Sequence, residues 1–514
     1  MEDTLAGFLV LIQPEVLLYL MIGVVAGLFI GAMPGLNDNI AFAVFIPFAF
    51  SMDAANALAL MVGVYCATAI GGAIPAIVLR VPGTASSLLS SVDGNAMARQ
   101  GRASEAISVA ISSSVFGGIT SAIVLIFLAP LLAAFALRFG PVENFALGVL
   151  GLASVVGMMQ GSVVKGVIAA AFGLLIATVG FHYGESRYTF GSFYLYQGVS
   201  LVPLLVGLFG VAAVLELVEE IVRDRRAGKS IGRFSESIKA VLPNKAMVVR
   251  LLPTWVRSSV IGNVIGVIPG AGALIAIYLS YDQAARSYAR KLGREEGATK
   301  WGEGVPEGVA APEAANNAVV ASSMVPLLSL GIPGNSVSAL FIAALEIQGL
   351  TPGPLLFQRS VDIAWMIILA FLAANILMGP VAYLMVKSMI RFVYSLPKSV
   401  LAAAIGFLCL TGAYAVESTI LGVWTALLFG FVGYGFKKMG VPIAPVILAV
   451  ILGERIESSL FNALQLSDGS WFVFVNPIAH PISAVLLAAS LFFIVTPFIK
   501  KRRRDAAEDA QSVS

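Results

Sequence analysis

The sequence predicts an all-α polytopic membrane protein that contains two inverted-topology repeats. Of its 514 residues, 58% are hydrophobic and only 12% are charged, whereas a soluble globular protein carries about 25% charged residues. No soluble core of this length could bury so much apolar surface, so the bilayer must be part of the solvent. Pro-Gly motifs also recur in both halves of the chain. Together these observations exclude most soluble enzymes, nucleic-acid binders and disordered scaffolds.

The net charge and the few reactive side chains exclude further classes of function. The formal net charge of +3 is too small to indicate a polyanionic partner. Cys66 and Cys409 both lie in apolar stretches, so we predict neither a disulfide framework nor a structural zinc site. The two histidines, His182 and His480, cannot build a histidine-rich metal centre. Because no segment resembles a nucleotide-binding loop, we expect no direct use of ATP, no cofactor and no enzymatic activity.

Membrane crossings need about 20 predominantly apolar residues each. The candidates are 15–33, 55–79, 104–137, 142–160, 163–181 and 199–221 in the first half, and 257–281, 314–331, 361–386, 399–415, 417–436, 442–460 and 478–498 in the second. Several are too long, too short or interrupted by Pro-Gly. We therefore predict about 10–12 transmembrane helices plus broken helices and re-entrant hairpins. Whether 257–281 crosses or re-enters stays open.

Lysine and arginine predict the orientation, because basic loops face the cytoplasm. Basic clusters lie at 99–102, 223–250, 387–398, 437–438 and 500–504. We therefore expect a periplasmic N-terminus and a cytoplasmic C-terminus. The predicted domains are a first repeat at 1–222, a cytoplasmic basic linker at 223–250, a second repeat at 251–470, a last transmembrane helix at 471–499 and a cytoplasmic basic tail at 500–514.

An internal duplication covers nearly the whole chain. Residues 31–40 read Gly-Ala-Met-Pro-Gly-Leu-Asn-Asp-Asn-Ile, and residues 266–275 read Gly-Val-Ile-Pro-Gly-Ala-Gly-Ala-Leu-Ile. The motif at 81–84 corresponds in the same way to the motif at 332–335. The first motif region ends inside, at Arg99 and Arg102, whereas the second must end outside, at 349–360, so the copies are inverted. Inverted repeats are typical of secondary transporters, which bind substrate near mid-membrane.

The first pair of motifs predicts broken helices, which leave backbone N–H groups for anions and carbonyl groups for cations. After the first break, Asn37, Asp38 and Asn39 place a carboxylate between two amides at membrane depth. Such a carboxylate is costly in lipid and is therefore a functional candidate. The alternative is a capping residue in a water-filled vestibule. With Gly270 and Gly272 after the second break, these residues are our candidates for ion coupling.

The second pair of motifs predicts two hairpin tips. Small hydroxyl or amide residues follow each Pro-Gly, as at a capped helix N-terminus that suits a carboxylate ligand. An ordinary capped turn is the alternative. The candidates for substrate binding are the residues of both tips, namely Pro82, Gly83, Thr84, Ser86, Pro333, Gly334, Asn335 and Ser336. We expect a sodium ion near Asp38 and Asn335.

The run from Gly304 to Asn317 is unusually polar for such an apolar chain. Glu313, Asn316 and Asn317 stand at i, i+3 and i+4, which puts them on one face of a helix predicted to begin at Pro312. They either coordinate the coupling ion and line the permeation path, or cap that helix.

These motifs resemble the large membrane subunit of the tripartite tricarboxylate transporters, the TctA family. The resemblance spans roughly residues 20–495 and rests on Pro34-Gly35, 93–102, 307–317, 330–334, 349–354 and 466–469. After Pro-Gly-Leu this chain has Asn37-Asp38-Asn39, where the family usually has Gly, Pro or Ala and then Thr. After the first tip it has Ala85-Ser86-Ser87, where a second proline and alanines are common. Both departures make the presumed site more polar.

The resemblance implies a bacterial inner-membrane importer of small carboxylates of the tricarboxylate or dicarboxylate type, such as citrate. Its partners would be a small four-helix membrane subunit and a periplasmic solute-binding protein that delivers the substrate. A gradient of sodium ions or protons would drive uptake by symport. We expect elevator-like alternating access, in which a transport domain built from both motif regions moves.

Three other functions remain as alternatives. A stand-alone carboxylate–cation symporter would differ only in its partners. A passive channel would transport without any ion dependence. An intramembrane hydrolase or lipid-modifying enzyme would need a nucleophile and a base at membrane depth, and the sequence offers no placed histidine for this role.

Overall fold

The computed structural model describes residues 2–33, 36–80, 83–158, 163–182, 185–226, 242–270, 272–291 and 299–512. Within these ranges the chain is almost entirely helical, and its strands are the short antiparallel pair β1 (Gly180–His182) and β2 (Glu185–Arg187). Seven helical segments of the described ranges are long and apolar enough to cross a bilayer. Large apolar side chains remain exposed on them, such as Phe127 at 74% and Leu384 at 82%. The predicted fold class, an all-α polytopic membrane protein, is confirmed.

The first half of the chain runs from α1 to α11. Its helices are α1 (Glu2–Leu11), α2 (Pro14–Gly31), α3 (Asp38–Phe50), α4 (Ala54–Gly71), α5 (Ala73–Leu79), η1 (Ala85–Ser87), α6 (Ser90–Arg99), α7 (Ala103–Ala136), α8 (Pro141–Met158), α9 (Val163–Ala177), η2 (Phe193–Leu195), α10 (Leu201–Leu205), the π-helical turn η3 (Val206–Val211) and α11 (Ala212–Arg226).

The second half runs from α12 to α22. Its helices are α12 (Lys245–Val267), α13 (Gly272–Lys291), α14 (Pro306–Ser322), α15 (Met324–Leu330), α16 (Ser336–Ile347), α17 (Leu356–Arg359), α18 (Val361–Ser395), α19 (Lys398–Glu417), α20 (Ile420–Lys438), α21 (Ala444–Leu466), η4 (Trp471–Phe474) and α22 (Pro481–Ser512).

The two halves present the same order of elements. In each, a helix (α2 or α12) ends at the Pro-Gly break and a second helix (α3 or α13) follows it. An interrupted helix (α4–α5 or α14–α15) then leads to the tip, and a short helix (α6 or α16) leaves it. A helix of 34 or 35 residues (α7 or α18) comes next. A duplicated unit predicts this order, and the inverted orientation of the second copy stays a prediction.

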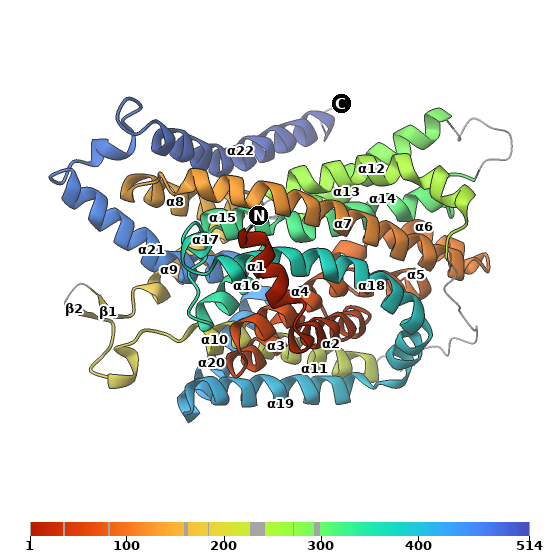
Figure 1. Cartoon of the computed structure of the whole chain (residues 1–514), viewed down its shortest axis with the longest axis horizontal. Coiled ribbons are helices and arrows are strands. Elements are labelled where there is room, and N and C mark those ends of the chain that lie inside the picture. The colour runs from red at the N-terminus through yellow and green to blue at the C-terminus, as the bar shows by residue number, and fades with distance from the viewer. Residues whose placement is uncertain are drawn as a thin grey trace.

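The centre of the molecule is formed by α4 and α14. Every residue of α14 is buried, and so is every residue of α4 after Ala55. Each contacts helices of both halves, α14 with α12 and α7, and α4 with α2 and α18. Glycines allow this close approach, since a Cβ on Gly117 would come within 2.1 Å of the Ala314 carbonyl oxygen. The halves are therefore interlocked. In Figure 1, α22 lies along the edge next to α8 and α19 runs along the opposite edge.

One helix prediction in the second half is confirmed and one is wrong. The candidate span 257–281 is interrupted at its Pro-Gly motif as predicted, because α12 ends at Val267 and α13 begins at Gly272. Gly270 and Gly272 have φ of 76° and 67°, a left-handed conformation that interrupts a helix. The predicted start at Pro312 is wrong. The helix α14 begins at Pro306, which takes the first-turn position that favours proline, and Pro312 lies inside it.

The structure also differs from the predicted boundaries of the linker, the last helix and the tail. Helix α11 continues to Arg226 and α12 begins at Lys245, so helices enter both ends of the predicted linker 223–250, while 227–241 lie outside the described residues. Residues 471–474 form a 3-10 turn, and the predicted last helix, 471–499, begins only at Pro481. It continues to Ser512, through most of the predicted tail 500–514.

Candidate functional site

A pocket of about 400 Å³ lies where the helix breaks of the two halves meet. Its volume is in the range of small-molecule sites. Ten of its lining residues are polar or glycine residues that the sequence singled out: Asn37, Asp38, Asn39, Thr84, Ser86, Gly270, Gly272, Asn316, Asn335 and Ser336. The others are Tyr65, Ala69, Ala85, Val155, Ala273, Leu274, Ile275, Val319, Val320, Val337 and Ala444. Among these described lining residues there is no lysine, arginine or histidine.

Three helices, α3, α13 and α16, begin at the pocket wall. Helix N-termini carry a partial positive charge and unpaired N–H groups, so their convergence favours an anion. Asn37 caps α3, because its Oδ1 accepts the Ile40 N–H at 3.0 Å. Asp38 is therefore the first residue of α3 and not its cap, and the capping alternative for this carboxylate is wrong.

The second tip is held by a capping box. The Asn335 Oδ1 accepts the Ser338 N–H at 2.8 Å, and the Ser338 Oγ accepts the Asn335 N–H at 2.8 Å. The Gly270 N–H donates to the Gly334 carbonyl oxygen at 2.9 Å, which joins the second break to the second tip. The second break and the second tip are therefore hydrogen-bonded to each other at the pocket.

The tips pack against helix interruptions in both halves. A Cβ on Gly83 would lie 2.1 Å from the Gly31 carbonyl oxygen, and one on Gly334 would lie 2.6 Å from that of Ser323. Only glycine allows the two backbones to come so close. In the first tip, the Thr84 Oγ1 lies 2.9 Å from the Ser86 Oγ. Pro82, assigned to this tip from the sequence, lies outside the described residues, and so do Pro34 and Gly35.

Three buried polar atoms of the pocket wall have no hydrogen-bond partner among the described residues. They are Asp38 Oδ1, Asn39 Oδ1 and Asn316 Nδ2. An unsatisfied buried polar atom costs about 1–3 kcal/mol, so native proteins keep few of them. Two of the three are oxygens that suit a cation, and the third is an N–H donor that suits a carboxylate. All three belong to residues that line the same pocket, which is consistent with a site for a polar ligand.

Tyr65 is a pocket residue that sequence reasoning missed. Its hydroxyl accepts a hydrogen bond from Asn335 Nδ2 at 2.7 Å and lies 3.1 Å from the Ser323 Oγ. It therefore connects α4 of the first half to the second tip. The available signal was a phenol hydroxyl in the middle of the largely apolar stretch 55–79.

The three polar residues that the sequence singled out on α14 lie in different environments. Asn316 lines the pocket, whereas Glu313 and Asn317 do not. The Glu313 carboxylate is fully buried and accepts hydrogen bonds from Ser90 Oγ at 2.5 Å and Ser114 Oγ at 3.0 Å. Because α14 begins at Pro306, none of the three residues caps it, and that alternative is wrong. A role of Glu313 and Asn317 in ion coupling stays a prediction.

The motif 93–102 builds a different polar region, which we call the Asp93 network. The Asp93 Oδ1 accepts the N–H groups of Gly302, Gly304 and Val305 at 3.0, 3.1 and 2.9 Å, and its Oδ2 accepts the Tyr281 hydroxyl at 3.0 Å. Burial raises the pKa of the Asp93 carboxyl above its ordinary value, and the four hydrogen bonds oppose the rise. The carboxylate thereby fastens the loop before α14 onto α6.

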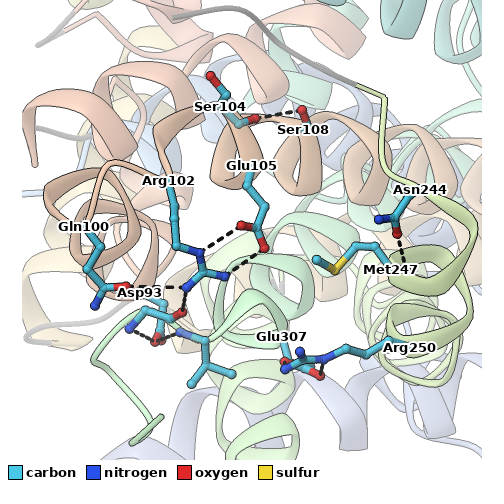
Figure 2. A network of polar contacts seen from close by, with 12 residues as sticks. Asp93, Gln100, Arg102, Ser104, Glu105, Ser108, Asn244, Met247, Arg250 and Glu307 are labelled. Atoms are coloured by element: carbon cyan, nitrogen blue, oxygen red, sulfur yellow. Dashed lines mark hydrogen bonds and ion pairs between the residues drawn. The ribbon is translucent and has the colours of Figure 1, made fainter. Parts of the chain in front are cut away.

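Two ion pairs extend this region, as Figure 2 shows. The Arg102 guanidinium donates to both carboxylate oxygens of Glu105 at 2.8 Å, and also to the Gly304 carbonyl oxygen at 3.2 Å. The Arg250 guanidinium donates to both oxygens of Glu307 at 2.7 and 2.8 Å. The motifs 93–102 and 307–317 thus meet here as a structural junction between the halves. Among the described residues, no group of three or more His, Cys, Asp or Glu side chains could hold a metal.

Comparisons with known proteins place the sequence among relatives of one family. The model of the tripartite tricarboxylate transporter TctA family matches residues 17–448. The chain is 33% identical over 513 residues to an uncharacterized 52.8 kDa protein in the TAR-I ttuC' 3' region of Agrobacterium vitis, and the match covers 98% of each chain. It is also 33% identical over 249 residues to an uncharacterized protein in the TAR-II ttuC' 3' region of the same organism, which covers 47% of this chain and 97% of that relative. No solved structure matches the chain significantly.

Proposed function

Because the chain belongs to the tripartite tricarboxylate transporter TctA family, whose members include the large membrane subunit of such systems, we propose that it imports small di- or tricarboxylates by ion-coupled symport. A sodium or proton gradient drives uptake across the bacterial inner membrane. A periplasmic solute-binding protein delivers the substrate, and a small four-helix membrane subunit completes the complex.

The chemistry of the pocket wall carries this proposal. Three helix N-termini and the unpaired donor Asn316 Nδ2 belong to one pocket, whose described lining has no basic side chain. A carboxylate can be held there by helix ends and uncharged donors. Asp38 Oδ1 and Asn39 Oδ1 at the same wall supply oxygen ligands for the cation. Substrate and ion would then share one pocket, which couples their binding.

The position of the pocket supports alternating access of the elevator kind. Its wall comes from α3 and η1 of the first half and from α13, α14 and α16 of the second. A transport domain made of both motif regions would carry the bound substrate and ion together past the remaining helices.

Uptake into proteoliposomes tests the proposal. Labelled di- and tricarboxylates are supplied to the protein alone, and then with the small subunit and the loaded binding protein, under imposed sodium or proton gradients. Accumulation only with the binding protein and one gradient is expected, and it identifies the cation. Uptake without any gradient dependence contradicts ion coupling.

The Asp38→Asn variant tests the site itself. Loss of the carboxylate is expected to reduce gradient-driven uptake by roughly tenfold or more, because an intramembrane carboxylate contributes a charge that an amide cannot replace. Asp53→Asn is the matched control, since Asp53 is exposed and lies outside the pocket. Equal uptake by both variants would remove Asp38 from the site.

A stand-alone carboxylate–cation symporter is the second candidate. It is favoured by the same pocket, because both the anion-binding and the cation-binding groups belong to this one chain. Gradient-driven uptake by the chain alone would establish it and would contradict dependence on the binding protein.

A further inference from the structure

A second hollow, of about 340 Å³, lies between α12 and α13, separate from the central pocket. It is lined by Arg257 of α12 and by Gln283, Arg286, Ser287 and Arg290 of α13. Three guanidinium groups therefore surround one space, and no acidic residue is among the described lining. This concentration of positive charge belongs to neither the substrate site nor the Asp93 network.

The basic side chains are held in place by both helices. The Arg257 Nη1 donates to the Ser287 Oγ at 2.7 Å and its Nε donates to the Pro253 carbonyl oxygen at 2.9 Å, which holds the guanidinium against α13. These bonds use two of the five N–H donors of the guanidinium. On α13, residues 283, 286, 287 and 290 stand at i, i+3, i+4 and i+7, so they share one face.

Among the described residues, the charges in this hollow are poorly compensated. Arg286 pairs with Asp282 at 2.8 Å, but both side chains are largely exposed, and exposed pairs of this kind contribute little. Arg286 and Arg290 are like charges at i and i+4, an arrangement that destabilises a helix. An anion between them would relieve this repulsion, and a phosphate would match the planar donors of arginine.

The same helix faces continue as exposed apolar surface. Val260 and Val264, three and seven residues after Arg257 on α12, are 57% and 58% exposed. Leu279, four residues before Gln283 on α13, is 49% exposed. Along both helices a basic end is thus followed by an apolar surface, which is the order of headgroup and acyl chain in a phospholipid.

We propose that the hollow between α12 and α13 binds the phosphate group of an anionic phospholipid. Arg257, Arg286 and Arg290 surround the phosphate, and the acyl chains lie along Val260, Val264 and Leu279. Free inorganic phosphate shares the headgroup chemistry but would leave the apolar surface unused. The inference does not depend on the transported substrate.

Native mass spectrometry of the detergent-purified protein tests the proposal. Phosphatidylglycerol and phosphatidylcholine are titrated separately onto the wild type and onto the double variant R257Q/R290Q. The control is R225Q/R226Q, which removes the same charge from exposed arginines at the end of α11. We expect R257Q/R290Q to weaken phosphatidylglycerol binding by roughly tenfold, because basic residues beside an anionic headgroup contribute to its binding. The control should leave binding unchanged, because Arg225 and Arg226 do not line the hollow.

Further measurements distinguish a bound phospholipid from free inorganic phosphate. An excess of inorganic phosphate should leave the lipid adduct intact, whereas its displacement would assign the hollow to free phosphate and overturn the lipid. Equal losses in both double variants, or equal binding of phosphatidylcholine, would also overturn the proposal. The variant R257K/R290K keeps the charge but lacks the planar donors, so it should bind with intermediate affinity. Unchanged melting temperatures show that each variant is folded.

Discussion

The central pocket and the Asp93 network contain carboxylates with opposite environments. The Asp93 carboxylate accepts four hydrogen bonds from the loop before α14 and from Tyr281. At the pocket wall, by contrast, Asp38 Oδ1 accepts none from any described residue. A fully satisfied buried network rigidifies a structure, whereas an unsatisfied one is costly unless something else binds to it. The difference separates a junction that holds the halves together from the pocket for which we propose ligand binding.

The largest expected effect belongs to Asp93→Ala. The substitution removes the acceptor for three backbone N–H groups and one hydroxyl, and buried donors left unpaired cost about 1–3 kcal/mol each. Since some donors will reach water, we expect a net loss of about 3–5 kcal/mol. It is measured as a lower melting temperature of the purified protein. Asp53→Ala, at an exposed cap without a side-chain bond, should change little. Equal melting of both variants would contradict a structural Asp93 network.

Glu307→Gln should have a smaller effect on stability. The Glu307 side chain is only 7% exposed, but its partner Arg250 is 41% exposed, so water compensates part of the broken pair. We expect a loss of about 1–2 kcal/mol. The control is Asp282→Asn, whose pair with Arg286 is exposed on both sides. A control effect as large as that of Glu307→Gln would show that burial is not what strengthens the pair.

Tyr65→Phe tests whether the Tyr65 hydroxyl positions Asn335 at the edge of the pocket. It removes the hydroxyl that accepts from Asn335 and lies beside Ser323, so about 1 kcal/mol should be lost. Because Asn335 would be less well held, the KM for uptake should rise more than the maximal rate falls. Tyr414→Phe is the control, since Tyr414 is 51% exposed and is not among the residues that line the pocket. An unchanged KM would contradict a positioning role.

The smallest expected change in stability is that of Asp38→Asn. Since one carboxylate oxygen is buried without a partner, replacing the charge with an amide should leave the melting temperature unchanged or raise it slightly. The same conservative substitution at Asp93 should lower the melting temperature. A large loss of stability in Asp38→Asn would show that Asp38, like Asp93, has a structural role. It would contradict the difference between the two carboxylates.

Much of the pocket could be predicted from local sequence. Pro-Gly motifs interrupt helices by backbone geometry alone, and an asparagine before a helix favours a cap, as Asn37 and Asn335 show. The candidate span 257–281 divides at Gly270, whose left-handed backbone ends the helix where the Pro-Gly motif predicted a break.

The partners of the buried polar groups could not be predicted. Glu313 is bonded to Ser90 and Ser114, which are 223 and 199 residues away in the chain. Asp93 is bonded to Gly302 and Val305, more than 200 residues away. Spacing within one helix says which residues share a face but not which neighbour covers that face.

The sequence by itself determined that the chain resides in a membrane, that its halves repeat and where its helices break, because composition and backbone sterics act locally. Tertiary structure decided which polar residues face the pocket. Asn316 lines it while Glu313, three residues earlier on the same helix, is enclosed by α6 and α7. The physical reason is that a buried helix such as α14 has neighbours on all sides, and only packing assigns each side chain to one of them.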